Sequence, residues 1–162
     1  MAGAERIFVG LGANLGDAAA SIRAAVAALG GLPQTRLIAA SFLYRSAPVD
    51  ADGPDYVNAV AELRSEIDPE TLLAQLQGLE QRFGRERPYR HAPRTLDLDL
   101  LSYGERRLVS ATLTLPHPRM HLRRFVLAPL VDVAPGCRLA DGRTATQALA
   151  ASTDPPVERI AS

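Results

Sequence analysis

The chain has 162 residues, with 18 basic and 18 acidic side chains and a formal net charge of zero at pH 7. Balanced charge argues against a protein that simply coats nucleic acid, and no apolar run is long enough to span a bilayer. All the basic residues are arginine, which excludes the phosphate-binding loops and protein-kinase strands that require a lysine.

The length and composition predict a single domain over residues 1–162. The N-terminus lacks the layout of a signal peptide, and the one cysteine, Cys137, cannot form an internal disulfide. A protein of the reducing cytoplasm is therefore expected. We also expect a monomer that contacts neither nucleic acid nor membrane.

A strand followed by a helix is predicted at the start of the chain. The apolar run 7–11 indicates a buried strand, which leads into G-L-G-A-N-L-G at 10–16. That spacing is one residue too long for a dinucleotide-binding fingerprint, so we interpret the glycines as a tight turn from strand to helix. Asp17 is expected to cap a helix that ends at Gly30.

Two further strands are predicted at 36–45 and 56–64, separated by a loop rich in Pro, Gly and Asp that is long enough to bind a ligand. Alternation in the later strand puts Tyr56 and Asn58 on one face. An aromatic ring and an amide together suit a flat heterocycle, and a half-buried structural pair is an equally good interpretation.

A helix is predicted from Pro69 to Gly84, because Asp68 followed by proline is a strong start signal and the glycine ends the pattern. Gln77 and Glu80, three residues apart, share a face of this helix that is separate from its leucine stripe.

Residues 95–102 predict a strand in which Asp97 and Asp99 project from one face and leucines from the other. Aspartate is unfavourable in strands, and two adjacent carboxylates repel unless a positive group lies between them. Magnesium, or the arginines just upstream, would satisfy this requirement.

Five arginines fall within thirteen positions before the aspartates. Guanidinium groups bind phosphate oxygens in a bidentate manner and stay charged. Each one alone is consistent with a solvated surface charge, but the group beside a carboxylate pair favours a phosphate clamp. They are Arg82, Arg85, Arg87, Arg90 and Arg94.

The rest of the chain predicts one or two short edge strands at 107–115, a helix at 121–130 with Leu122 turned partly inward, a short helix near 144–151 and a frayed tail. The order strand-helix-strand occurs twice. It predicts an α+β protein with a ferredoxin-like antiparallel sheet, helices packed on its faces, extra edge strands and a C-terminal helical extension.

Several motifs, in the same order along nearly the whole chain, resemble the 6-hydroxymethyl-7,8-dihydropterin pyrophosphokinase family. The most specific is R-H-A-P-R-T-L-D-L-D-L-L at 90–101, and others are G-L-G-A-N-L-G, P-D-Y-V-N-A, E-Q-R-F-G-R and L-P-H-P-R. The resemblance implies a ferredoxin-like fold. It also implies transfer of a pyrophosphoryl group from ATP to the hydroxymethyl oxygen of the pterin, with release of AMP, in folate biosynthesis.

The resemblance also implies roles for individual residues. Asp97 and Asp99 would bind two Mg²⁺ ions and act in catalysis with Arg85 and Arg94. ATP would be bound by Gln77, Glu80, Arg87, Arg90, Arg94, His117 and Arg123. Tyr56 and Phe125 would sandwich the pterin ring, and the other pterin contacts would be Ser46, Pro48, Val49 and Asn58. The chain departs from the family at His91, where tryptophan is common, and at Pro118, where tyrosine is common.

Two other functions fit parts of the pattern. A magnesium-dependent nucleotidyltransferase also combines a glycine-containing turn with a D-x-D strand, but it would attach AMP and release pyrophosphate. A non-catalytic RNA-binding module on a ferredoxin-like sheet would need exposed aromatic residues and a basic face, and aspartates on the strand would repel RNA.

Overall fold

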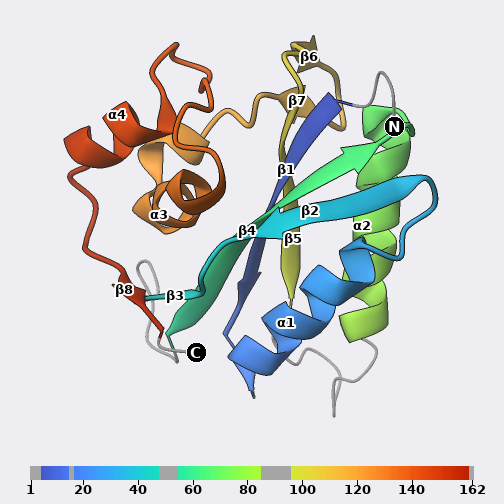
Figure 1. Ribbon diagram of the computed structural model, residues 1–162, viewed down its shortest axis with the longest axis horizontal. Helices are drawn as coiled ribbons and strands as arrows, with labels where there is room; N and C mark the ends of the chain where they lie inside the picture. Colours follow the sequence, from blue (N-terminus) through green and yellow to red (C-terminus); the bar gives the residue numbers. More distant parts are fainter. Residues whose placement is uncertain (1–4, 15–16, 48–54, 85–95, 161–162) are drawn as a thin grey trace.

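An antiparallel sheet lies at the centre of the protein (Figure 1). The computed structural model describes residues 5–14, 17–47, 55–84 and 96–160. In this part of the chain the strands of the sheet are β1 (Glu5–Ala13), β2 (Thr35–Ala40), β3 (Tyr44–Ser46), β4 (Tyr56–Ser65), β5 (Asp97–Tyr103) and β8 (Glu158–Arg159). Strand β1 lies between β5 and β4. Strands β2 and β3 pair one after the other with the outer edge of β4, and β8 pairs with β3.

The helices cover both faces of the sheet. Side chains of α1 and α2 join one buried cluster with Val9 and Leu63, whereas α3 and α4 join another with Phe8 and Val60. Because neighbouring residues of a strand point to opposite faces, the two clusters lie on opposite sides. Figure 1 draws the two helix pairs on opposite sides of the strands. The helices are α1 (Ala18–Leu29), α2 (Pro69–Gly84), α3 (Arg124–Val133) and α4 (Ala145–Ala151), with a 3₁₀ turn at Met120–Leu122.

The predicted helix starts are confirmed by side-chain caps. Asp17 accepts a hydrogen bond from the Ala20 N–H at 3.0 Å, and Asp68 accepts one from the Thr71 N–H at 2.9 Å. Each carboxylate satisfies a backbone donor that has no partner within its own helix. Local sequence was therefore sufficient to place these two boundaries.

The prediction of one strand over 36–45 is wrong, because β2 and β3 are separated by residues 41–43. The Ser41 backbone N–H donates to the Val60 carbonyl at 2.8 Å, and the Ser41 hydroxyl accepts from the Val60 N–H at 2.9 Å. A side-chain oxygen thus replaces a backbone carbonyl in the ladder, and the strand is interrupted there.

Four other predictions need correction. Gly10 and Gly12 lie inside β1, not in a turn. Residues 108–115 form a separate two-stranded hairpin, β6 (Leu108–Val109) with β7 (Thr114–Leu115), and not an edge of the main sheet. Helix α3 begins later and ends later than predicted, and Leu122, which belongs to the preceding 3₁₀ turn, is 61% exposed and not turned inward. The tail is ordered by strand pairing as β8.

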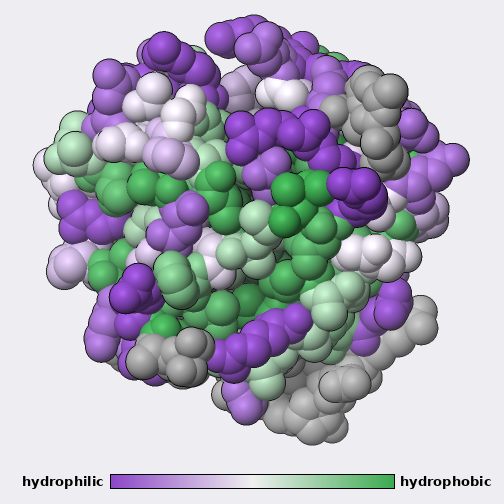
Figure 2. Space-filling view, in the orientation of Figure 1, coloured by the Kyte–Doolittle hydropathy of each residue, from purple (hydrophilic) through white to green (hydrophobic). Residues whose placement is uncertain are grey.

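Hydrophobic side chains also gather across the middle of one face of the molecule, ringed mainly by hydrophilic ones (Figure 2). Phe42, next to β3, is one of the exposed large hydrophobic residues, and the guanidinium of Arg159 lies 4.5 Å from its ring centroid. The C-terminal strand therefore covers part of the exposed Phe42 ring. Within the described ranges, no helix combines the length and the apolar character needed to cross a bilayer.

Replacing Leu63 of β4 with alanine should lower the free energy of unfolding by about 3 kcal/mol, because its fully buried side chain would leave a cavity in the cluster under α1 and α2. Urea denaturation followed by circular dichroism measures the change. The control is Val109→Ala in β6, where the side chain is 86% exposed and the expected change is within about 0.5 kcal/mol. Equal midpoints for the two variants would contradict this account of the core.

Candidate active site

A pocket of about 510 Å³ opens on the sheet face that α3 covers. This volume is in the range of small-molecule sites in proteins. Residues from β1, β3, β4, β5, the first turn of α3 and the C-terminal segment line it. Seven residues predicted from the sequence lie together here: Ser46, Tyr56, Asn58, Asp97, Asp99, Arg123 and Phe125.

Two glycines of β1 form the floor of this pocket. Gly12 pairs with Asn58 on β4 and with Asp97 on β5, and Gly10 pairs in the same way with Asp99. A Cβ atom at Gly12 would lie 3.1 Å from the Asn58 side-chain nitrogen, which is tighter than ordinary packing. Sequence reasoning missed this role. Glycines at alternate strand positions were the signal, because a strand glycine often marks a close approach by a ligand or another group.

The amide of Asn58 is buried and oriented. The residue is only 6% exposed, and its Oδ1 accepts a hydrogen bond from the Ser46 hydroxyl at 2.9 Å. Strand pairing sets this contact, because Ser46 on β3 lies opposite Tyr56, two residues from Asn58 on β4. The amide therefore presents a fixed edge of hydrogen-bonding groups in the pocket.

Two aromatic rings line the pocket from different elements, Tyr56 from β4 and Phe125 from the first turn of α3. The guanidinium of Arg123 lies 5.7 Å from the centroid of the Phe125 ring, which is cation–π distance. The alternation predicted for β4 is confirmed, since Tyr56 and Asn58 share this face while Val57 and Ala59 belong to the cluster under α1 and α2.

The carboxylates of β5 project as predicted. Asp97 and Asp99 are exposed and line the pocket, whereas Leu98 and Leu100 are buried on the opposite face. Among the residues that the structure describes, no group of three or more His, Cys, Asp or Glu side chains could hold a metal ion. A pair of carboxylates suits Mg²⁺, which commonly takes one or two protein carboxylates and completes its shell with water and substrate phosphates.

His117 lies near enough to Asp99 to feel its charge, although it is not among the residues that line the pocket. Its backbone N–H donates to the Leu101 carbonyl at 2.7 Å, and its Nδ1 accepts from the Arg119 N–H at 3.1 Å, so the neutral ring carries its proton on Nε2. Burial lowers the pKa of His117, and Arg123 and Arg119 lower it further, while the negative charge of Asp99 opposes them.

Of the predicted ATP contacts on α2, Glu80 has a clear structural partner: its Oε2 accepts a hydrogen bond from the Leu98 N–H at 2.8 Å. This hydrogen bond connects α2 to β5, the strand that carries Asp97 and Asp99. Gln77 is exposed on the same helix, and neither residue is among those that line the pocket.

Six other predicted site residues lie outside the described part of the chain: Pro48, Val49, Arg85, Arg87, Arg90 and Arg94. Asp154 also lines the pocket, and sequence reasoning missed it because its segment was interpreted as a frayed tail.

A pocket of this size in an α+β protein, with glycine backbone at its floor and an amide, carboxylates and aromatic rings around it, is typical of a site for a small flat molecule. Comparison with known families narrows the class of protein. The chain belongs to the 7,8-dihydro-6-hydroxymethylpterin-pyrophosphokinase family, whose model matches residues 8–135.

Individual relatives agree with this assignment. A 2-amino-4-hydroxy-6-hydroxymethyldihydropteridine pyrophosphokinase of Pseudomonas aeruginosa is 46% identical over 157 residues, which are 96% of this chain and 97% of the relative. The enzyme of the same name from Haemophilus influenzae is 40% identical over 141 residues, or 86% and 88% of the two chains. The crystal structure of Plasmodium falciparum HPPK-DHPS resembles the fold with a TM-score of 0.69 at 12% identity, covering 91% of this chain and 41% of that longer one.

The His117 ring should titrate below its ordinary pKa of about 6.5 in magnesium-free buffer, because its surroundings disfavour the charged form. At pH values between the lowered pKa of the folded protein and the ordinary pKa of the unfolded chain, the imidazole is protonated more in the unfolded chain. His117 therefore makes the free energy of unfolding fall as the pH drops through that interval. NMR titration of the imidazole measures it. Replacing Asp99 with Asn should lower the midpoint further, whereas Asp141→Asn should not shift it. A midpoint at or above 6.5 in the wild type would refute the burial argument.

Proposed function

We propose that the pocket binds 6-hydroxymethyl-7,8-dihydropterin next to ATP for the reaction of the family, the transfer of pyrophosphate from ATP to the hydroxymethyl group in folate biosynthesis. The row of paired residues Asn58, Gly12 and Asp97 carries the proposal. Neighbouring strands are about 4.8 Å apart, so the outer two backbones of this row lie about 10 Å apart. A two-ring heterocycle with a hydroxymethyl arm spans that distance, with its ring at Asn58 and its hydroxyl at the carboxylates.

On the pterin side, the Asn58 amide is oriented to hydrogen-bond the edge of the heterocycle, and Ser46 maintains that orientation. Tyr56 and Phe125 are suited to pack against the two faces of the ring. The proposed contacts at Pro48 and Val49 rest on the family resemblance, since both residues lie outside the described ranges.

On the nucleotide side, Asp97 and Asp99 would hold two Mg²⁺ ions, which neutralise triphosphate charge when bound. Their exposure on one strand face, opposite glycines that bring no side chain between them, fits such ions. Four described residues are proposed to contact ATP: Gln77, Glu80, neutral His117 and Arg123. Glu80 also holds the start of β5 in place. Arg85, Arg87, Arg90 and Arg94 are proposed as phosphate ligands from the resemblance alone.

Most of the catalysis is then positioning and charge neutralisation. The pterin hydroxymethyl oxygen gives its proton to an aspartate carboxylate or to water and forms a bond to the β-phosphorus of ATP, while the bond from that phosphorus to the bridging oxygen of the α-phosphate breaks. AMP therefore leaves, and the pterin carries both terminal phosphates.

We also propose a ferredoxin-like arrangement in one domain over residues 1–162. The strand order β5-β1-β4-β2 supports it, with α1 connecting β1 to the next strand along the chain and α2 connecting β4 to β5. A monomer working in the cytoplasm remains our proposal from the sequence.

Product analysis tests the function. Wild-type protein incubated with ATP, Mg²⁺ and the hydroxymethyl pterin should release AMP and form the pterin diphosphate. Asp97→Asn and Asp99→Asn should each lower kcat/KM by at least about 10²-fold, the scale of losing one transition-state electrostatic contact. Chromatography of the nucleotides gives both results.

Asp141→Asn, which removes a carboxylate outside the pocket, is the matched control and should keep wild-type turnover. Release of ADP would refute pyrophosphoryl transfer, and attachment of AMP with release of pyrophosphate would identify a nucleotidyltransferase instead.

Gly12→Ala should raise KM for the pterin about tenfold or more and change KM for ATP much less, because the new methyl group would displace the Asn58 amide. Gly78→Ala in α2 is the matched control: its Cβ would meet nothing within 4 Å, and alanine should stabilise the helix by up to about 1 kcal/mol. Steady-state kinetics with each substrate varied in turn measures the effect. Equal KM values for the pterin in Gly12→Ala and wild type would show that the floor of the pocket tolerates a side chain.

A further inference from the structure

The C-terminal segment, residues 152–160, runs from the start of α3 to the edge of β3 (Figure 1). These two elements carry Phe125 and Ser46, which line the pocket from different sides. The segment lies beyond residues 8–135, the part of the chain that matches the family model. One of its side chains, Asp154, lines the same pocket.

At its first end the segment holds the N-terminus of α3. The Arg124 backbone N–H donates to Asp154 Oδ2 at 3.1 Å, and the Arg124 Nη2 donates to the Ser152 carbonyl at 2.8 Å. The Asp154 N–H in turn donates to the Ser152 hydroxyl at 3.2 Å, which shapes this end of the segment.

Helix α3 lacks a cap from its own sequence. Its N-cap residue is Arg123, whose side chain makes no capping hydrogen bond. The first N–H groups of a helix have no partner inside the helix, and a carboxylate oxygen is among the best acceptors for them. Asp154 supplies that acceptor from thirty residues downstream, and its negative charge also suits the positive end of the helix dipole.

At its other end the segment is anchored by strand pairing. Residues Glu158 and Arg159 of β8 pair with β3, and the Ile160 N–H donates to the Leu43 carbonyl at 2.8 Å. Ile160 also packs against the buried cluster under α1 and α2. Anchoring both ends reduces the conformational freedom that Asp154 would otherwise have to lose in order to reach α3.

We infer that Asp154 is a positioning residue for substrate, which holds the first turn of α3 so that Phe125 and Arg123 face the pocket. The inference rests on the proposed function. Phe125 directly follows the residue whose N–H is capped, so the direction of its side chain depends on the geometry of that turn. Removing the cap would free the first turn and with it one aromatic side of the pterin site.

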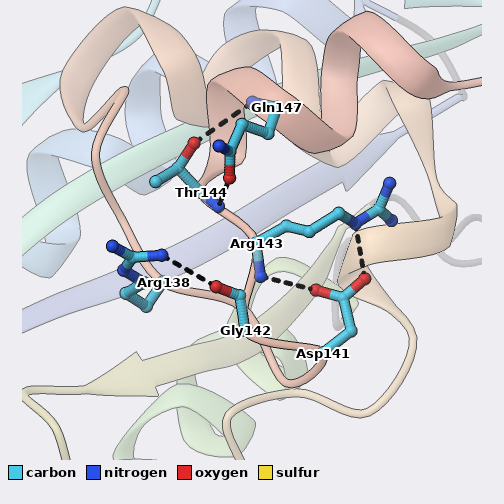
Figure 3. A network of polar contacts seen from close by, with 6 residues as sticks. All are labelled: Arg138, Asp141, Gly142, Arg143, Thr144 and Gln147. Atoms are coloured by element: carbon cyan, nitrogen blue, oxygen red, sulfur yellow. Dashed lines mark hydrogen bonds and ion pairs between the residues drawn. The ribbon is translucent and has the colours of Figure 1, made fainter.

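Asp141 provides a matched control in the same part of the chain. Its Oδ1 accepts from the Arg143 N–H at 3.0 Å and its Oδ2 from the Arg143 Nε at 2.7 Å, in the turn before α4 (Figure 3). Like Asp154, Asp141 accepts a hydrogen bond from a backbone N–H through its carboxylate, but Asp141 does not line the pocket. Loss of a carboxylate that caps backbone can thus be compared at a site near to substrate and a site away from it.

The experiment uses full-length wild type and the series Asp154→Asn, Asp154→Gly and Asp154→Ala, with Asp141→Ala as the control. Asparagine keeps a side-chain oxygen that can accept from the Arg124 N–H, whereas glycine and alanine have no side-chain acceptor at this position. KM for the pterin, and its Kd measured by fluorescence with a non-hydrolysable ATP analogue, should therefore rise in Asp154→Gly and Asp154→Ala and stay near the wild-type values in Asp154→Asn. We expect about five- to tenfold for Asp154→Ala and less than about twofold for Asp154→Asn and Asp141→Ala.

Each alternative result is decisive. Equal loss in Asp154→Asn and Asp154→Ala would mean that the charge acts and the cap does not, which overturns the inference. An unchanged KM and Kd with a lowered melting temperature would reduce Asp154 to a structural role and overturn it as well. If Asp154→Ala does not fold, the comparison of Asp154→Asn with Asp154→Gly decides. A wild type that makes no AMP refutes the proposed function itself, whereas an active wild type matched by Asp154→Ala refutes only this inference.

Discussion

The pairing of β1 between β4 and β5 is the constraint on which the rest of the structure depends. It aligns Asn58, Gly12 and Asp97 in one row across three strands. The leucines on the opposite face of β5 maintain this register, because a shift by one residue would turn both aspartates into the apolar cluster under α1 and α2. Burying unpaired carboxylates there would cost far more than the leucine contacts could return.

The same constraint explains why this pocket lies on the face of the sheet that α3 covers. On the side of α1 and α2, the sheet is covered by buried leucine, isoleucine and valine side chains. On the side of α3, Gly10 and Gly12 offer bare backbone, while Asn58 and the aspartates stand at either side. Helix α3 closes the space with Phe125, and residues 152–160 hold that helix at its first turn. The site is therefore a gap that the sheet leaves open and that later parts of the chain enclose.

Sequence patterns with a local cause were confirmed. The i and i+2 spacing of Asp97 and Asp99 between leucines predicted their shared face, and the caps at Asp17 and Asp68 predicted where two helices begin. Patterns with a non-local cause were misinterpreted. Residues 36–45 look like one strand, but Ser41 forms hydrogen bonds with Val60 on another strand and interrupts it.

The sequence by itself determined the family, the carboxylate pair and the residue types that we propose for the two substrate sites, because motifs and strand alternation are properties of neighbouring residues. Only the tertiary structure decided that Gly12 is the floor between Asn58 and Asp97, that Glu80 binds the backbone of β5, and that Asp154 caps α3. Each of these joins residues that are at least eighteen positions apart in the chain. Such contacts depend on how the strands and helices pack together, and no local pattern encodes that packing.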